Sequence, residues 1–360
     1  MNMTVKTFFQ NSTLKEANTL FIKKEYDEAL RIYKYIISKY GELEKALTFN
    51  ILKCESEITK KNSNIKRNTT GFESLEYQKE YIEEHYLFTS KAITLRELHS
   101  LDKYSNSVIK KIQELEKRID VLSFDVFDTV LLRNDKSEAR RFWEISEHFS
   151  KRVGLETLSL FLARIEAANI AYSISKKRKN NVEGKYINIA KIVCAIIGKP
   201  SMVLDYCENE INYEIDNLEL SKTFEKIIDS CRTKKVVFMS DMYFSSRDIK
   251  ILLLKKIESK LNIELVFSSA DGWGSKRGAG SLYKHLSKTI KKEPEKICHL
   301  GDNYYSDFVG AIDKGLHAIY LPCPILEINN RKKCYNDLKE ELQNKYQKII
   351  KLDSILNFNM

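Results

Sequence analysis

The chain has 360 residues and a formal net charge of +10 at pH 7. Hydrophobic residues make up 43% of the chain and charged residues 31%, proportions that fit folded domains and exclude wholesale disorder. With only 12 glycines and 4 prolines, the sequence is neither fibrous nor of low complexity.

The seven cysteines are scattered and include no Cys-x-x-Cys pair, which argues against a disulfide framework and a zinc cage. We therefore expect a reducing, cytoplasmic location. No signal peptide and no apolar run of ~18 residues is visible, so we expect no membrane span. The positive charge permits phosphate-bearing partners, but the basic clusters at 176–179 and 331–333 are short. Without a stripe of arginines and aromatics, we expect no nucleic-acid partner.

Residues 1–117 are expected to form an all-helical region. Apolar residues recur there at helical spacing. The residues that carry the pattern are Ala17, Leu20, Tyr26, Ala29, Tyr33 and Ile36. Their small and aromatic side chains weakly resemble a tetratricopeptide repeat hairpin, although only one repeat is visible and an ordinary helical hairpin is an equal alternative. The polar stretch 61–74 predicts a linker before a further helical segment, and the whole region is a candidate surface for a protein partner.

From residue 118 onward, short apolar runs alternate with helical patterns, which predicts an α/β fold with a Rossmann-like parallel sheet. The predicted strands are 119–124, 234–239, 263–269, 296–300 and 317–321. Residues 135–225 contain no strand-like run and predict an inserted all-α module. The core is expected to end near residue 325, and residues 326–360 predict a C-terminal helical extension.

Polar residues follow several of these strands directly. They are Asp125, Ser240, Asp241, Asp302 and Asp307. Each taken singly has a structural explanation as a cap or turn residue. Because the carboxyl ends of parallel strands meet at one edge of a sheet, we expect them to converge there, together with a basic residue of the loop 275–280. Clustered carboxylates repel one another unless a cation lies among them, so the pattern favours Mg²⁺ and a substrate phosphate.

The stretches SFDVFDTVLLR, MSDMYFSS and GDNYYSD, in this order and spacing, resemble the haloacid dehalogenase (HAD) superfamily over residues 118–325. Most members of that superfamily are Mg²⁺-dependent phosphatases with a helical cap at the place of the inserted module. The resemblance implies that Asp125 is the nucleophile, which takes the phosphoryl group as an aspartyl phosphate. It also implies that Ser240 hydrogen-bonds the phosphoryl oxygens and that Lys276 neutralises their charge.

The same resemblance assigns the remaining site residues. The implied metal residues are Asp125, Phe127 through its backbone carbonyl, Asp302 and Asp307, the last positioning either the metal site or the lysine. The implied substrate-binding residues are Thr129 and Asp241. Arg277 is an alternative to Lys276 as the cation, and Lys276 is preferred because a compact ammonium suits a point-charge role.

Phe127 departs from the superfamily's pattern, which has a second aspartate at this place as general acid and base. A general acid contributes typically 10²–10⁴-fold to the rate. Asp128 or a cap residue could replace it, the enzyme could be slow or favour phosphotransfer, or the substrate could be a haloacid. The Gly-Asp motif at 301–302 favours a phosphate.

The residues of these motifs look closest to those of a branch of the superfamily associated with bacterial surface-polysaccharide biosynthesis. That likeness suggests a sugar or polyol phosphate as the substrate. Arg133, Arg164 and Glu166 are candidate substrate contacts, with surface or cap-packing charges as the alternative. His299 is expected to be a core histidine, and Trp273 either shields the site or packs within its loop. A competing function is a helical adaptor or interaction protein whose sheet domain turns over slowly or not at all.

Overall fold

The computed structural model describes residues 93–346, apart from 176–182, 232–233, 258–260 and 278–279. Before residue 93 it describes residues 17, 20–21, 25–39, 51, 54–55 and 88. The chain forms two compact units, residues 1–80 and 81–360, and each is described by itself. The predicted linker 61–74 and the basic cluster 176–179 lie outside the described residues.

In the first unit, helix α2 (Tyr26–Lys39) contributes to a small hydrophobic cluster. The buried members of this cluster are Ala17, Ala29, Tyr33, Ile51 and Cys54. The ring of Phe21 meets that of Tyr33 edge-on, with centroids 6.3 Å apart. The small and aromatic residues of the sequence pattern therefore pack together, and their resemblance to a tetratricopeptide repeat stays a prediction.

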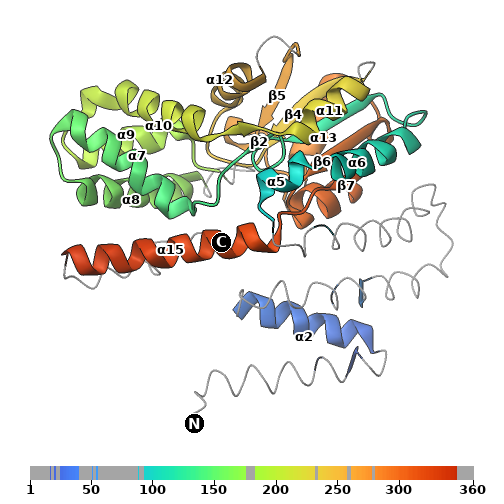
Figure 1. Cartoon of the computed structure of the whole chain (residues 1–360), viewed down its shortest axis with the longest axis horizontal. Helices are drawn as coiled ribbons and strands as arrows, with labels where there is room; N and C mark the ends of the chain where they lie inside the picture. Colours follow the sequence, from blue (N-terminus) through green and yellow to red (C-terminus); the bar gives the residue numbers. More distant parts are fainter. Residues whose placement is uncertain are drawn as a thin grey trace. The chain divides into compact units, whose positions relative to one another are not determined.

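The second unit is built on five parallel strands in the order β5-β4-β1-β6-β7 (Figure 1). The strands are β1 (Val121–Asp125), β4 (Lys235–Ser240), β5 (Leu265–Ser268), β6 (Ile297–Gly301) and β7 (His317–Tyr320). All five residues of the central strand β1 are buried, as expected for a parallel sheet covered on both faces. The predicted α/β fold class and all five predicted strands are confirmed.

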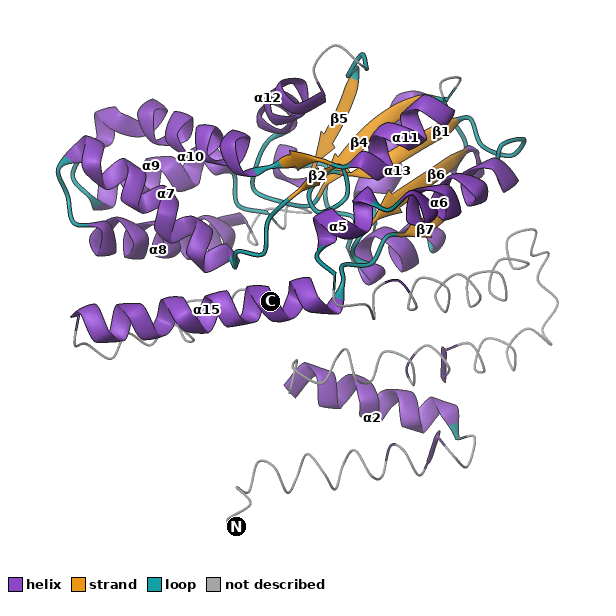
Figure 2. Cartoon of the chain, viewed as in Figure 1, coloured by secondary structure: helices purple, strands orange, loops and turns teal. Residues whose placement is uncertain are grey.

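Helices cover both faces of the sheet (Figure 2). Successive residues of a strand point to opposite faces, so each strand contributes side chains to two hydrophobic clusters. Leu122 and Phe124 face a cluster that includes α6 (Asp102–Glu114), α11 (Lys222–Ser230) and α12 (Ser246–Ile257). Val121 faces a second cluster, built with α13 (Ser281–Ile290). The shorter helical elements are η2 (Pro200–Met202), η3 (Ser269–Asp271), η4 (Pro294–Lys296), the π-helix η5 (Tyr304–Val309) and α14 (Gly310–Ile312).

Four helices form the inserted module, which we call the cap. They are α7 (Glu138–Val153), α8 (Thr157–Ser175), α9 (Tyr186–Ile196) and α10 (Val203–Asn217). The cap lies between β2 (Leu131–Leu132) and β3 (Glu219–Leu220), which pair antiparallel, so the chain enters and leaves it through one short ribbon. The all-helical insertion predicted between the first two sheet strands is therefore present.

Helices that precede the sheet in the sequence and a helix that follows it also belong to the second unit. Before the sheet, α5 (Leu95–Ser100) and α6 are tied to the segment at α11: His99 Nδ1 lies 2.7 Å from Ser221 Oγ, and Ser105 Oγ lies 2.9 Å from Thr223 Oγ1. After the sheet, α15 (Ile325–Tyr346) forms one long helix. The domain divisions predicted at residues 117 and 325 stay predictions. None of the described helices has the length and apolar character needed to cross a membrane.

Deleting residues 1–80 is expected to leave the second unit folded, whereas deleting residues 1–117 should destabilise it. The longer deletion removes α5 and α6 and with them the buried Leu98, Val108 and Ile112. Each large apolar side chain lost from a core costs about 2–5 kcal/mol. Thermal unfolding of both truncations by circular dichroism checks this, and equal midpoints would contradict it.

Candidate active site

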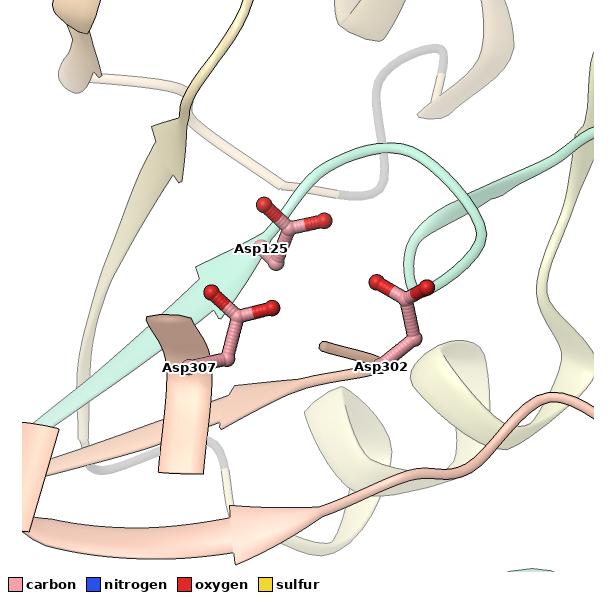
Figure 3. A group of neighbouring side chains, drawn as sticks. All are labelled: Asp125, Asp302 and Asp307. Carbon is pink, nitrogen blue, oxygen red and sulfur yellow. The ribbon is translucent and has the colours of Figure 1, made fainter. Parts of the chain in front are cut away.

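Three carboxylates meet at the carboxyl-terminal edge of the sheet (Figure 3). Asp125 ends β1, Asp302 follows β6, and Asp307 lies in η5 just beyond it. One oxygen of each carboxylate lies within 4.8 Å of the corresponding oxygens of the other two. Ser240 ends the adjacent strand β4 and is buried, one residue beyond the partner of Asp125 in the ladder. The polar residues predicted at the ends of β1, β4 and β6 therefore lie at the same edge of the sheet.

The ammonium group of Lys276 lies between two of these carboxylates. Its Nζ contacts Asp125 Oδ1 and lies 2.6 Å from Asp307 Oδ1, and the lysine side chain is only 2% exposed. The backbone amide of Lys276 donates to both carboxylate oxygens of Asp241, each at 2.9 Å. Asp241, assigned to substrate binding from the sequence, therefore holds the loop that carries the lysine.

The residue beside this lysine has a different environment. Arg277 is 58% exposed, and its Nε lies 3.7 Å from Asp241 rather than at the carboxylate cluster. Of the two basic residues that the sequence left as alternatives, Lys276 is the one that contacts Asp125. Trp273, in the same loop, is 56% exposed and stacks on His285 with ring centroids 4.3 Å apart.

Buried polar groups fix the orientation of Asp307. Its Oδ1 lies 3.4 Å from His299 Nε2, and its Oδ2 accepts a 3.0 Å hydrogen bond from the backbone amide of Asn303. His299 Nδ1 in turn lies 2.9 Å from Ser123 Oγ on β1. His299 is buried, as expected of a core histidine, but it also supports a site residue, which sequence reasoning missed because a histidine inside an apolar run gives no sign of its partner.

Gly301 allows Asp307 to approach the end of β6. A Cβ atom built at this position would lie 2.5 Å from the carboxylate carbon of Asp307, closer than real Cβ contacts. The Gly-Asp pair that follows β6 is therefore a packing requirement. Any side chain at this glycine would displace the carboxylate that pairs with Lys276.

Burial and mutual repulsion set the protonation of the cluster. Burial raises the pKa of Asp125 to about 7, because the charge of Lys276 offsets only part of the desolvation. Burial and the charge of Asp125 hold the pKa of Asp302 well above its usual range. Burial also acts to raise the pKa of Asp307, but Lys276 and then His299 outweigh it and hold that pKa below its usual range.

The cluster fits a divalent cation. When all are ionised, the three carboxylates and one ammonium leave a formal charge of −2 in a largely buried site. Carboxylate oxygens are the ligands that Mg²⁺ prefers, and an ion here would relieve the repulsion that raises the pKa of two of them. Asp125 and Asp302 are the residues proposed to hold it: Lys276 contacts only one oxygen of Asp125, whereas both oxygens of Asp307 have partners, Oδ1 in Lys276 and His299 and Oδ2 in the amide of Asn303.

The residues that follow Asp125 do not supply the expected acid. The ring of Phe127 is buried beneath the guanidinium of Arg133, 4.2 Å from centroid to Cζ. Asp128 accepts two hydrogen bonds from Arg331 of α15, at 2.7 and 3.0 Å. Although burial acts to raise the pKa of Asp128, the charge of Arg331 outweighs it and holds that pKa below its usual range. An ionised, paired carboxylate has no proton to donate, so Asp128 does not replace the missing acid.

Thr129 lies in the loop that follows Asp125. It is buried, and its Oγ1 has no hydrogen-bond partner among the residues that the structure describes. A buried hydroxyl without a partner costs about 1–3 kcal/mol, which a ligand oxygen would relieve. Its place in the loop agrees with the substrate-binding role assigned from the sequence, which stays a prediction.

Two cap residues, Arg164 and Glu166, are candidate substrate contacts from the sequence. Neither takes part in the ion pairs of Lys276 with Asp125 and Asp307. Arg164 is fully buried, with Nη2 3.1 Å from Glu210 Oε1, and its guanidinium lies 4.1 Å from the ring centroid of Phe142. The same guanidinium lies 4.9 Å from the ring centroid of Tyr243, which follows β4, and a substrate contact by Arg164 stays a prediction. Glu166, on the same helix α8, is exposed.

Glu183 is a cap residue that sequence reasoning did not single out. It lies just before α9, is buried, and interacts electrostatically with Asp241 and Arg277 at the lysine loop. Burial raises the pKa of Glu183 and the charge of Asp241 adds to this, whereas a hydrogen bond with Tyr172 and the charge of Arg277 act to lower it. Glu183 is therefore a buried carboxyl group of the cap that holds its proton more strongly than usual and is electrostatically coupled to Asp241 and Arg277.

No family model matches the sequence, and no curated protein matches it. Among solved structures, a 2-haloacid dehalogenase from Pseudomonas syringae shares 12% identity at a TM-score of 0.40, over 56% of this chain and 86% of that one. A Bacillus subtilis protein described as a HAD-hydrolase bound to magnesium shares 13% identity at a TM-score of 0.37, over 57% of this chain and 89% of that one. A predicted phosphoglycolate phosphatase from Haemophilus somnus shares 11% identity at a TM-score of 0.36, over 57% of this chain and 86% of that one. At such values, the activity has to be inferred from the site itself.

Mg²⁺ binding is expected to release protons and to strengthen as the pH rises. Below about pH 7, Asp125 carries a proton that the ion must displace, because burial raises its pKa to about 7, and the raised pKa of Asp302 adds to this competition. The apparent affinity should rise by up to ~10-fold per pH unit for each displaced proton. Isothermal titration between about pH 6 and pH 8, in buffers of different ionisation enthalpy, measures both quantities.

Two variants control this titration. Asp302→Asn should abolish binding, whereas Asp313→Asn, at an exposed position beyond α14, should leave it unchanged. An affinity that does not change with pH, or one that survives Asp302→Asn, would place the ion elsewhere.

Proposed function

We propose that this protein is a Mg²⁺-dependent phosphohydrolase that acts through an aspartyl phosphate on Asp125. The substrate class we propose is a small phosphorylated metabolite, with a sugar or polyol phosphate of surface-polysaccharide synthesis as the specific candidate suggested by the motif wording. The observation that carries the proposal is the buried ammonium of Lys276 at Asp125, beside a carboxylate cluster that needs a further cation. Phosphoryl transfer depends mainly on positioning and on neutralising charge, which this arrangement supplies.

The proposed reaction has two steps. A carboxylate oxygen of Asp125 attacks phosphorus, the ester P–O bond breaks, and the leaving alkoxide takes a proton. Water then attacks the phosphorus of the aspartyl phosphate and gives up a proton to the group that protonated the alkoxide, and the P–O bond to Asp125 breaks to restore the carboxylate and release phosphate. Lys276 offsets the charge of the phosphoryl oxygens in both steps, and the Ser240 hydroxyl donates a hydrogen bond to them.

The metal contributes electrostatically. When bound by Asp125, Asp302 and the carbonyl of Phe127, Mg²⁺ would neutralise further phosphoryl charge and favour the ionised form of the nucleophile. Asp307 keeps Lys276 in place, because it contacts the same ammonium group as Asp125 and is itself held by His299.

The proton for the leaving group requires a donor other than Phe127 or the ion-paired Asp128. We propose Glu183 of the cap for this role. Its carboxyl group is buried and interacts electrostatically with Asp241 and Arg277, and burial raises its pKa, which favours the protonated form that a general acid needs. A closing cap would bring such a residue to the substrate while excluding water.

A haloacid is the second candidate substrate, since Phe127 stands where phosphatases of the resembled superfamily carry an acid. Displacement of a halide by Asp125 needs no donated proton. The carboxylate cluster favours the phosphate, because its partly neutralised negative charge fits a divalent cation, which phosphoryl transfer uses and halide displacement does not need. Halide release from 2-chloropropionate, measured beside phosphate release, separates the two reactions.

Asp125→Asn is expected to abolish phosphate release while leaving the fold intact. The assay is a panel of sugar, polyol, amino-alcohol and nucleoside phosphates, with Mg²⁺ and with EDTA. Activity that persists in the variant would overturn the nucleophile assignment. Absence of turnover in the folded, metal-bound wild type would instead favour phosphotransfer or the adaptor function, with residues 1–117 as the partner-binding region.

Glu183→Gln is expected to slow hydrolysis of alkyl phosphates by 10²–10⁴-fold, the typical contribution of a general acid. Hydrolysis of p-nitrophenyl phosphate should change far less, because nitrophenolate leaves without a proton. The ratio of the two kcat/KM values is the measurement, and Glu147→Gln, at an exposed position of cap helix α7, is the matched control. An equal loss on both substrates would exclude Glu183 as the acid.

A further inference from the structure

The C-terminal helix α15 contacts the loop that follows the nucleophile. Arg331 donates from both terminal nitrogens to the carboxylate of Asp128, at 2.7 and 3.0 Å, across 203 positions of the chain. Its Nε lies 3.1 Å from Glu327 Oε1, and the other oxygen of Glu327 accepts a hydrogen bond from the backbone amide of Leu95. All three guanidinium nitrogens of Arg331 have partners, and the residue lies on a long helix. Its guanidinium can therefore hold the loop after Asp125 in one position.

Asp128 needs such a fixed point. Its φ of +59° is in the left-handed region, which non-glycine residues adopt at a cost of about 1–3 kcal/mol unless the surroundings enforce it. The same carboxylate accepts a hydrogen bond from the amide of Arg133, and the amide of Asp128 donates to the carbonyl of Leu131. The ion pair with Arg331 therefore fixes a tight turn that begins one residue after Asp125.

Helix α15 also contacts the cap. Glu341, three turns beyond Arg331, forms a bidentate ion pair with Arg140 of α7, at 2.7 and 2.8 Å. Figure 1 shows α15 passing along the cap helices and reaching the core beside α5. This second ion pair is at the surface, where such pairs contribute about 0–1 kcal/mol, so it serves as a reference for the first.

We propose that Arg331 is a positioning residue for phosphoryl transfer, acting through Asp128 to hold the turn that aims Asp125 and the carbonyl of Phe127. This inference rests on the proposed function for its catalytic readout. Arg331 itself does not contact the carboxylate cluster: its described partners are Asp128 and Glu327. A displacement of the nucleophile by about 1 Å can cost 10²-fold in rate, so loss of the clamp should lower kcat more than it raises KM.

The test compares Arg331→Met, Arg331→Lys and Glu341→Gln. Arg331→Met should lower kcat by about 10²-fold with KM changed less than about threefold. Arg331→Lys keeps the charge without the two-pronged geometry and should recover only part of the rate. Glu341→Gln removes the surface ion pair of the same helix and should leave kcat unchanged. Asp128→Asn, which tolerates the left-handed backbone, should match Arg331→Met, and the double variant should be no slower than either, because both act through one contact.

Hydrogen exchange gives a readout that does not depend on the reaction. Amides of 126–133 should exchange faster in Arg331→Met and in Asp128→Asn, but not in Glu341→Gln, while the strands of the sheet stay protected. If the wild type releases no phosphate, the proposed function fails and the exchange data decide the positioning role alone. Unchanged kcat together with unchanged exchange in 126–133 would overturn the inference; if Arg331→Met does not fold, Arg331→Lys and Asp128→Asn carry the same comparison.

Discussion

The buried ammonium of Lys276 between Asp125 and Asp307 is the interaction on which the site depends. Two carboxylates at one buried sheet edge coexist in ionised form only with a counter-charge between them. Every supporting contact serves this arrangement. Asp241 anchors the backbone of the lysine loop, and His299 orients Asp307 from inside the sheet.

One lysine leaves the cluster incompletely neutralised, and this imbalance gives the site its chemistry. Burial and repulsion raise the pKa of Asp125 and Asp302, so the metal-free cluster holds protons that a divalent cation would replace. The same electrostatic condition thus links the expected metal affinity to the ionisation of Asp125, on which the proposed function depends. The structure separates this role from that of Asp128, whose charge is already paired with Arg331.

The loop after Asp125 is stabilised from outside the sheet. Phe127 packs under Arg133, and Asp128 is held by a helix that follows the last strand. The cap leaves the core only a few residues later, through the β2–β3 ribbon. Asp125, the cap entrance and the C-terminal helix are therefore connected through one loop, which is the physical basis of the positioning role proposed for Arg331.

The sequence by itself determined the five strands, the helical insertion and the convergence of Asp125, Ser240 and Asp302. Those features follow from backbone periodicity and from the rule that parallel strands present their carboxyl ends together. Only the tertiary structure decided between Lys276 and Arg277, because a small rotation of one loop determines which neighbour points inward. It alone paired His299 with Asp307, Arg164 with Glu210 and Arg331 with Asp128, because charge pairs between distant segments leave no periodic signal and depend on which side chains the folded elements bring within contact distance.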